Sequence, residues 1–190
     1  MNSILDVIGS FVIGGLVILL LTQINSSIKT SNYEKEFDML NQSRIITTNE
    51  IFKDDLYKLG YRVPGSKILS ADSTTIKFCS DYDDDGTVDT IYYYLGNTGE
   101  LSNTSNPSDK PLYRVFNHGQ PIFEEAVTNF KMTFYDSSGT EINYTSLVNQ
   151  TSRNLVRGIQ LRIDCESAEK VEGNYESISW QQVVKPKNLM

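Results

Sequence analysis

Residues 4–24 read ILDVIGSFVIGGLVILLLTQI, an apolar run with a single acidic residue, Asp6, near its start. An α-helix rises about 1.5 Å per residue, so about 20 such residues span the roughly 30 Å hydrocarbon core of a bilayer. A carboxylate at membrane depth costs roughly 2.5 to 3.5 kcal/mol and usually has a partner or a function. The run predicts a membrane-spanning helix, with Asp6 as its candidate functional residue.

Three other interpretations compete with a membrane span that also has a function. A secretory signal peptide would carry Lys or Arg before the apolar run and a small-x-small cleavage site after it, and neither is present. A buried helix of a soluble domain is usually shorter, and polar residues 25–32 follow this one. Asp6 at headgroup level, as an ordinary solvated end residue, stays open as the third interpretation.

Length and charge limit the remaining classes of protein. The chain of 190 residues holds the apolar run plus one domain of about 130 to 150 residues. Its net charge of -7 argues against binding to nucleic acid or to an anionic membrane surface, since either needs a basic face. The flanking charges do not fix the orientation of the span, because no Lys or Arg precedes it.

The helical pattern continues beyond the apolar run. Apolar residues at helical spacing are Tyr33, Phe37 and Leu40, and then Phe52, Leu56 and Leu59. Gly60 suits the left-handed conformation that often follows a helix, and Pro64 prevents resumption. We therefore expect one long helix that ends near Leu59 and whose second part packs against a folded head.

After Pro64 the apolar period changes from 3.6 to 2. Six strands are predicted at residues 74–80, 88–95, 112–116, 127–135, 156–165 and 175–184. Short connections rich in Gly, Asn, Asp and Ser favour antiparallel pairing. The predicted fold class is α+β, a long N-terminal helix packed against an antiparallel β-sheet head. The predicted parts are a membrane-spanning helix (1–26), its amphipathic continuation (27–60) and a β-rich head (61–190).

An acidic stretch between the first two predicted strands is a candidate metal site. Asp81, Asp83 and Asp85 alternate, Gly86 takes the sixth place and Asp89 the ninth, as in the first half of a calcium loop. The twelfth place is Tyr92 rather than a bidentate Glu, which excludes a complete helix-loop-helix site. Calcium is the one cofactor that the sequence indicates, and a solvated acidic hairpin is the alternative.

Cys79 and Cys165 are the only cysteines, and both fall in predicted strands. An isolated pair in an oxidising exterior more often bonds than stays reduced, so a disulfide is predicted, with two buried free thiols as the alternative.

No active site is predicted. The single His118 lies in a turn-like stretch, and no Ser or Cys nucleophile has a matching base. The acidic pairs 54–55 and 124–125 are interpreted as solvated surface, and Trp180 as a core residue. We therefore expect a protein that is not an enzyme.

Six blocks follow one another along the chain: residues 2–7 (NSILDV), 54–61 (DDLYKLGY), 76–86 (IKFCSDYDDDG), 112–114 (LYR), 126–135 (AVTNFKMTFY) and 185–189 (KPKNL). In this order they resemble the type IV pilins and type II secretion pseudopilins, most closely PilW-type minor pilins and J-type pseudopilins. Mature members open with a Phe-Thr-Leu-Ile-Glu-like block, and Asp6 is fifth here if Met1 is absent. They are made with a short basic leader ending in Gly, so this chain is expected to be either a mature or trimmed form or an uncleaved relative that keeps Met1.

The resemblance implies a function for Asp6. In pilin-like filaments the corresponding acid is thought to pair with the N-terminal amine of a neighbouring subunit, which neutralises two charges in apolar surroundings. It also implies an N-terminus at the cytoplasmic side, a head outside, and an extracellular location after assembly. The expected partners are the membrane and other pilin-like subunits, both through the N-terminal helix.

Two classes of function follow. The first is a structural subunit, a minor pilin or pseudopilin of a type IV pilus-like filament or secretion pseudopilus. The second is a single-pass membrane-anchored binding module that captures a partner outside the cell without polymerising, and it would need the helix but not Asp6.

Overall fold

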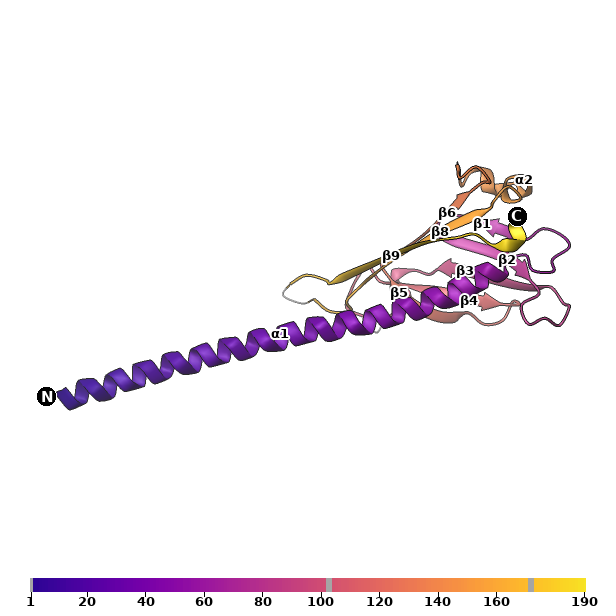
Figure 1. Ribbon diagram of the computed structural model, residues 1–190. Coiled ribbons are helices and arrows are strands. Elements are labelled where there is room, and N and C mark those ends of the chain that lie inside the picture. Colours follow the sequence, from indigo (N-terminus) through magenta and orange to yellow (C-terminus); the bar gives the residue numbers. More distant parts are fainter. Residues whose placement is uncertain (1, 102–103, 171–172) are drawn as a thin grey trace. The chain divides into compact units, whose positions relative to one another are not determined.

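The computed structural model describes residues 2–101, 104–170 and 173–190, except the side chains of residues 2, 5, 34 and 37–45 (Figure 1). The predicted contacts of Phe37 and Leu40 therefore lie outside the described residues. The chain divides into two compact units, Met1–Leu40 and Asn41–Met190, and each is described by itself.

The first element is the helix α1, Asn2–Lys58, which runs without interruption through the apolar stretch. Two hydroxyl groups in that stretch bond backward to the backbone, Ser10 Oγ to the Asp6 carbonyl and Thr22 Oγ1 to the Ile18 carbonyl, each at 2.8 Å. Such bonds let polar side chains sit in an apolar helix without further partners. Residues Asp6–Tyr33 are long and apolar enough to cross a membrane, which agrees with the predicted span.

The predicted end of the helix is confirmed. Gly60 has φ of +77°, the left-handed conformation that closes many helices. A Cβ at this position would come within 2.7 Å of the Lys67 side chain, so the glycine also makes room for that lysine.

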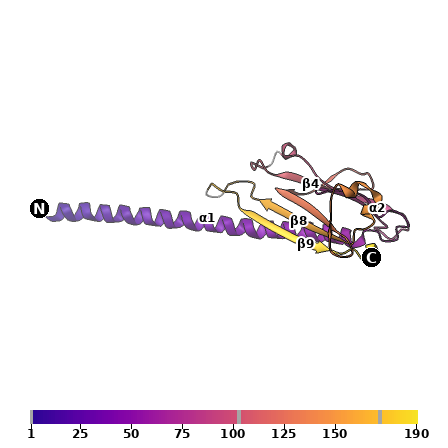
Figure 2. The same ribbon diagram turned by 90° about the horizontal axis from the view of Figure 1, so that it is seen from above.

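Two antiparallel sheets form the head. The first has the order β1-β2-β3-β4-β5, and the second has the order β7-β6-β8-β9 (Figures 1 and 2). The strands are β1 (Ile68–Ala71), β2 (Thr75–Ser80), β3 (Asp89–Leu95), β4 (Lys110–Phe116), β5 (Ile122–Val127), β6 (Asn129–Tyr135), β7 (Glu141–Ile142), β8 (Gly158–Glu166) and β9 (Ser177–Val184). Short helical turns lie between or after them: η1 (Thr98–Glu100), η2 (Ser146–Val148), α2 (Gln150–Arg153) and η3 (Lys187–Leu189).

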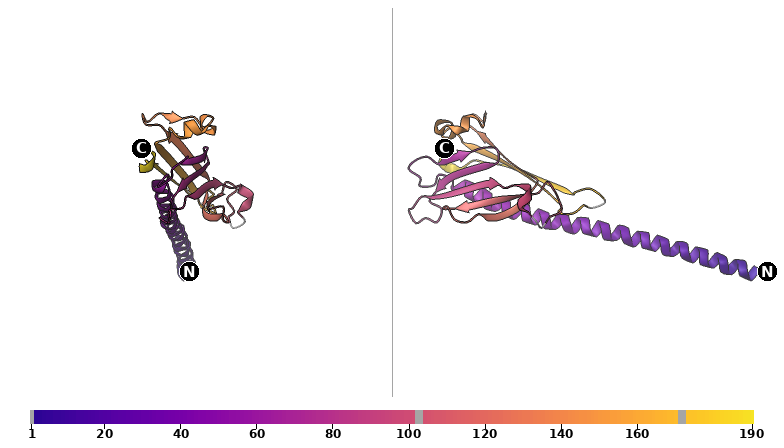
Figure 3. Two further views of the ribbon diagram at one scale, coloured as in Figure 1. Left: turned by 90° about the vertical axis from the view of Figure 1, so that its right-hand side faces the viewer. Right: turned by 180° about the vertical axis from the view of Figure 1, so that it is seen from behind.

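The last turns of α1 join the core that the two sheets enclose, an arrangement seen from two other sides in Figure 3. Phe52 contacts Tyr93 of β3 with ring centroids 4.4 Å apart and Phe130 of β6 at 5.8 Å. One helix residue therefore touches both sheets, and Leu56 and Leu59 are buried beside it. The predicted α+β fold, with the helix packed on antiparallel sheet, is confirmed.

Where the structure differs from the prediction, it has more strands and a second sheet. The described residues form nine strands, and the three that the sequence pattern did not predict are β1, β5 and β7. Each lies at the edge of its sheet, but so does the predicted β9, whose exposure alternates; β1 has only four residues and no alternation. In β5 the acids Glu124 and Glu125 conceal the pattern, and β7 has only two residues.

Candidate functional site

The apolar part of α1 exposes its side chains in every direction around the helix. Residues 16–21 are six consecutive apolar residues, and each is between 47 and 67% exposed. Successive residues on a helix point about 100° apart, so six of them cover the whole circumference. A helix that is apolar all round needs lipid or other chains around it. This surface is the first candidate site.

Asp6 lies on this part of the helix and its side chain is exposed. Among the described residues, no side chain or backbone group pairs with its carboxylate. An acid in such surroundings can pair with a cation from outside this chain.

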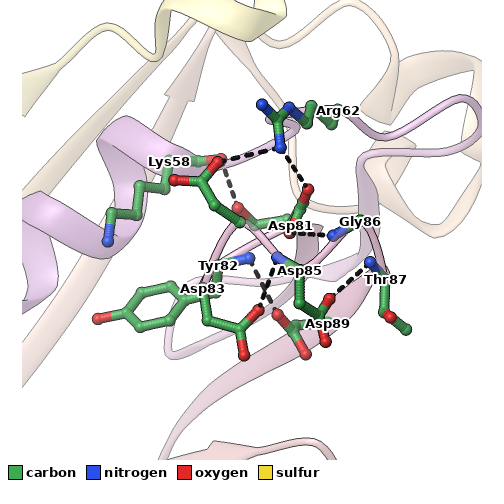
Figure 4. Close-up of polar contacts among 11 residues, drawn as sticks. Lys58, Arg62, Asp81, Tyr82, Asp83, Asp85, Gly86, Thr87 and Asp89 are labelled. Carbon is green, nitrogen blue, oxygen red and sulfur yellow. Dashed lines mark hydrogen bonds and ion pairs between the residues drawn. The ribbon is translucent and has the colours of Figure 1, made fainter.

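The second candidate site is the acidic loop, residues 81–89, which follows β2 and leads into β3 (Figure 4). Asp81, Asp83 and Asp85 each place one carboxylate oxygen so that the three atoms lie within 4.8 Å of one another. Asp83 and Asp85 are exposed, whereas Asp81 is buried. The sequence therefore predicted three residues that the structure brings together.

Backbone groups and positive φ angles hold the loop in shape. Gly86 N–H donates to Asp81 Oδ1 at 3.3 Å, and Thr87 N–H donates to Asp85 Oδ1 at 2.7 Å. Asp84 and Gly86 have φ of +65° and +85°, which lets the chain turn tightly.

Asp89, the fourth predicted ligand, does not belong to that group of three. Its Oδ2 accepts a hydrogen bond from Tyr82 N–H at 2.9 Å, and its Oδ1 accepts one from the Asn117 amide. Both carboxylate oxygens are occupied within the protein, so Asp89 fixes the loop to the hairpin of β4 and β5.

A cation is already present at the loop, and the sequence pattern did not reveal it. Arg62 Nη1 lies 3.2 Å from Asp81 Oδ2 and 3.2 Å from Asp84 Oδ1. The hydrogen bond to Asp81 raises the pKa of Arg62. The only sequence signal was an Arg two residues after the helix-ending Gly60. Arg62 is half exposed and pairs with Asp81 and Asp84. Asp83 and Asp85 each accept one backbone N–H at Oδ1, which leaves their Oδ2 atoms for a hard cation, whose preferred ligands are carboxylates.

A buried cluster around Asp55 corrects the prediction of a solvated acidic pair. Asp54 is exposed and pairs with Lys58, as expected, but Asp55 is completely buried. Arg114 of β4 approaches Asp55 with Nε–Oδ2 at 2.7 Å and Nη2–Oδ1 at 3.1 Å, and Tyr93 Oη donates to Oδ2 at 2.6 Å. Asp55 is buried because it lies on the helix face that packs into the core. It stands next to Leu56 and one turn from Phe52 and Leu59, which are all in the core.

The pKa values of Tyr93 and Arg114 are both raised, as expected for a structural ion pair with a neutral tyrosine beside it. Burial, followed by the charge of Asp55, raises the pKa of Tyr93 well above its ordinary value. Burial opposes the charge of Arg114, but the hydrogen bond and charge of Asp55 outweigh it and the pKa of Arg114 is raised. Tyr93 is a neutral donor and Arg114 a fixed cation, so the cluster links α1 to the first sheet.

The predicted disulfide is not formed. Cys79 and Cys165 are free thiols, both buried, and they lie on strands of different sheets, β2 and β8. Burial raises the pKa of both, that of Cys165 to about 12. The alternative of two buried thiols, which the sequence left open, describes the structure.

No family model, curated protein or solved structure matches this chain.

Proposed function

We propose that this chain is a structural subunit, of the minor pilin or pseudopilin kind, in a filament assembled through its N-terminal helix. The observation that carries the proposal is the contrast between the exposed apolar circumference of residues 16–21 and the exposed carboxylate of Asp6 on the same helix. An anchor alone requires the first feature. The carboxylate costs free energy at membrane depth, and a simple anchor has no reason to retain it.

In this proposal the apolar surface contacts lipid before assembly and neighbouring subunits afterwards. Asp6 accepts the N-terminal amine of a neighbouring copy or related subunit, which neutralises two charges in apolar surroundings and sets the register between subunits. The N-terminus then lies at the cytoplasmic side and the head outside the membrane.

The test is Asp6→Ala in cells that carry the assembly machinery for this chain. We expect the variant to insert in the membrane with a folded head but to be lost from filaments sheared off the cell surface, as measured by immunoblot of the sheared fraction against the membrane fraction. Asp6→Glu, which keeps the charge, should recover part of the assembly.

A matched control is Ser10→Ala in the same part of the helix. Its hydroxyl bonds only to the Asp6 carbonyl in its own helix, so its loss leaves the exposed carboxylate in place. Equal amounts of Asp6→Ala and Ser10→Ala protein in sheared filaments would contradict the role of Asp6.

The alternative function is a single-pass anchored binding module outside the cytoplasm that does not polymerise. It is favoured if the wild-type chain stays in the membrane fraction after shearing while its head is accessible at the cell surface.

The acidic loop has a second proposed property, the binding of calcium by Asp81, Asp83 and Asp85. The close approach of their three oxygens, within 4.8 Å, supports it, since Arg62 pairs with Asp81 but not with Asp83 or Asp85, and a calcium ion would offset the remaining repulsion. Calcium there would stabilise the head rather than take part in a reaction.

A further inference from the structure

Three cations line one pocket between residues of α2, the start of β1 and the C-terminal residues. Figure 1 labels α2, β1 and the C-terminus at the same end of the head. The pocket has a volume of about 470 Å³, and Lys67, Arg153 and Arg157 line it together with Ser66 and Asn154. In a chain whose net charge is -7, such a concentration of positive charge does not follow from composition.

None of these cations is neutralised within the part of the chain that the structure describes. The ion pairs there involve other residues, and none joins Lys67, Arg153 or Arg157 to an acid or to the carboxyl end of Met190 on the rim. Their hydrogen-bond acceptors are neutral oxygens instead. Arg157 Nη1 donates to the carbonyls of Asn154 and Val156 at 2.7 and 2.8 Å, and Lys67 Nζ donates to the Asn188 carbonyl.

The cations are held in place by the surrounding backbone. Arg153 Nη1 donates to the Leu147 and Val148 carbonyls, both at 2.7 Å, so this side chain is fixed and serves the fold. The stem of Lys67 packs where Gly60 has no Cβ. The Nε and Nη2 groups of Arg157 and two of the three protons of Lys67 donate to no described residue. The pocket therefore has positioned cations with unused donors.

We propose that this pocket binds a tetrahedral oxyanion of charge about -2, a phosphate or sulfate group. Three positively charged residues on one pocket suit a dianion, whereas one carboxylate would neutralise only one of them. Arg157 and Lys67 are the direct donors, and Arg153 supplies charge and shape. A neighbouring hollow of about 790 Å³ shares Arg157 and Met190 with the pocket, and gives room for the organic part of a phosphate ester. This inference does not rest on filament assembly.

The test uses the full chain in detergent and follows the melting temperature of the head during titration with sodium phosphate at about pH 7.5, where phosphate is mostly the dianion. Sodium chloride at equal ionic strength is the reference, because screening alone also shifts stability. We expect the melting temperature to rise beyond the chloride reference, and to keep rising with the logarithm of phosphate concentration above a dissociation constant on the order of 1 mM. Glycerol phosphate is the second ligand. If it binds more tightly than inorganic phosphate, the ligand of the pocket is a phosphate ester; if it binds more weakly, the ligand is the free anion.

Two variants locate the site. Arg157→Gln removes a direct hydrogen-bond donor and should weaken phosphate binding at least about tenfold. Asn154→Asp adds a negative charge at the pocket, so it should weaken phosphate binding by a similar factor. It keeps the oxygen that accepts a hydrogen bond from Gln150 Nε2 at 2.9 Å, so the protein should still fold. If Arg157→Gln does not fold, Asn154→Asp decides.

The matched control is Arg162→Gln, which removes one positive charge from β8 outside the pocket, where Arg162 pairs with Asp164 at 3.1 Å. It should bind phosphate as the wild type does. Equal phosphate and chloride effects in the wild type, or an equal phosphate effect in Asn154→Asp and Arg162→Gln, would overturn the proposal.

Discussion

The two ends of α1 have the same backbone conformation and opposite surroundings. In residues 16–21 every side chain is apolar and exposed. Near the C-terminal end, Phe52, Leu56 and Leu59 are fully buried at helical spacing, and charged residues such as Lys53 and Asp54 occupy the other face. The first pattern requires an environment from outside the chain, and the second is satisfied by the chain itself.

The acids in the two regions differ in the same way. Asp55 is buried and has Arg114 and Tyr93 as partners within the head. Asp6 has no partner among the described residues. Asp55 is therefore paired within the head, and in the assembly proposal an Asp6 surrounded by lipid or by other helices takes a comparable partner from another chain. That comparison supports the assembly proposal.

The largest effect is expected when Asp55, the acid that is paired within the head, is removed. Asp55→Ala leaves Arg114 as a buried charge without its carboxylate, and should lower the free energy of unfolding of the head by about 3 to 5 kcal/mol. Urea denaturation of the full chain in detergent, followed by the circular dichroism of the β-sheets, measures it.

Asp54→Ala and Asp6→Ala are the controls for that variant. The exposed pair of Asp54 with Lys58 should contribute less than about 1 kcal/mol, and Asp6 nothing to the unfolding of the head. A loss for Asp54→Ala as large as that for Asp55→Ala would mean that the buried cluster does not hold the helix to the sheet.

A leucine-to-alanine change in each region compares apolar burial directly. Leu56→Ala empties space in the core and should cost about 2 to 5 kcal/mol in the unfolding of the head. Leu20→Ala removes the same atoms from an exposed position and should leave that free energy unchanged. Equal losses from both changes would contradict the contrast between the two regions.

Calcium is expected to stabilise the buried end of α1 and not the apolar end. The acidic loop is bonded to the close of the helix, since Ser80 Oγ donates to the Lys58 carbonyl at 2.8 Å and Asp81 N–H to the Tyr61 carbonyl at 2.9 Å. At a calcium concentration ten to a hundred times the dissociation constant, binding should add about 1.4 to 2.7 kcal/mol to the stability of the head.

The calcium prediction is checked by calorimetry in millimolar calcium against magnesium. Asp83→Asn, which removes an exposed carboxylate from the group of three, should abolish the rise in melting temperature, while Asp72→Asn in the turn between β1 and β2 should retain it. Absence of a calcium-dependent rise in the wild type would leave the acidic loop as a solvated hairpin.

The long helix, its end at Gly60 and the six strands with alternating patterns could be predicted because each depends on local periodicity and turn chemistry. The strands β1, β5 and β7 could not, since β1 and β7 are only four and two residues long and the exposure of β5 does not alternate. The three-carboxylate group was predictable from spacing within one loop. Arg62 and Arg114 were not, because each meets its acid only after distant segments fold together.

The cysteines illustrate the same limit. Their presence in strands was predictable, but whether two strands face each other closely enough for a bond depends on sheet order. Cys79 on β2 and Cys165 on β8 belong to different sheets, and both are free and buried.

The smallest expected effect concerns Cys165, which lies in the core that the last turns of α1 help to form. Burial, together with the charges of Glu125, Asp109 and Asp164, raises its pKa to about 12 in the native state. The unfolded chain ionises this thiol above about pH 9, so it binds fewer protons than the native state there, and stability falls as the pH rises. From about pH 8 to pH 10 the loss from this group should be about 1.4 kcal/mol.

Cys165→Ala should be less stable at pH 8 but show a correspondingly shallower fall of stability with pH in urea denaturation, while Tyr93 contributes equally to both proteins. The same slope in the wild type and the variant would mean that Cys165 is open to solvent and that the core beside α1 is less closed than its burial indicates.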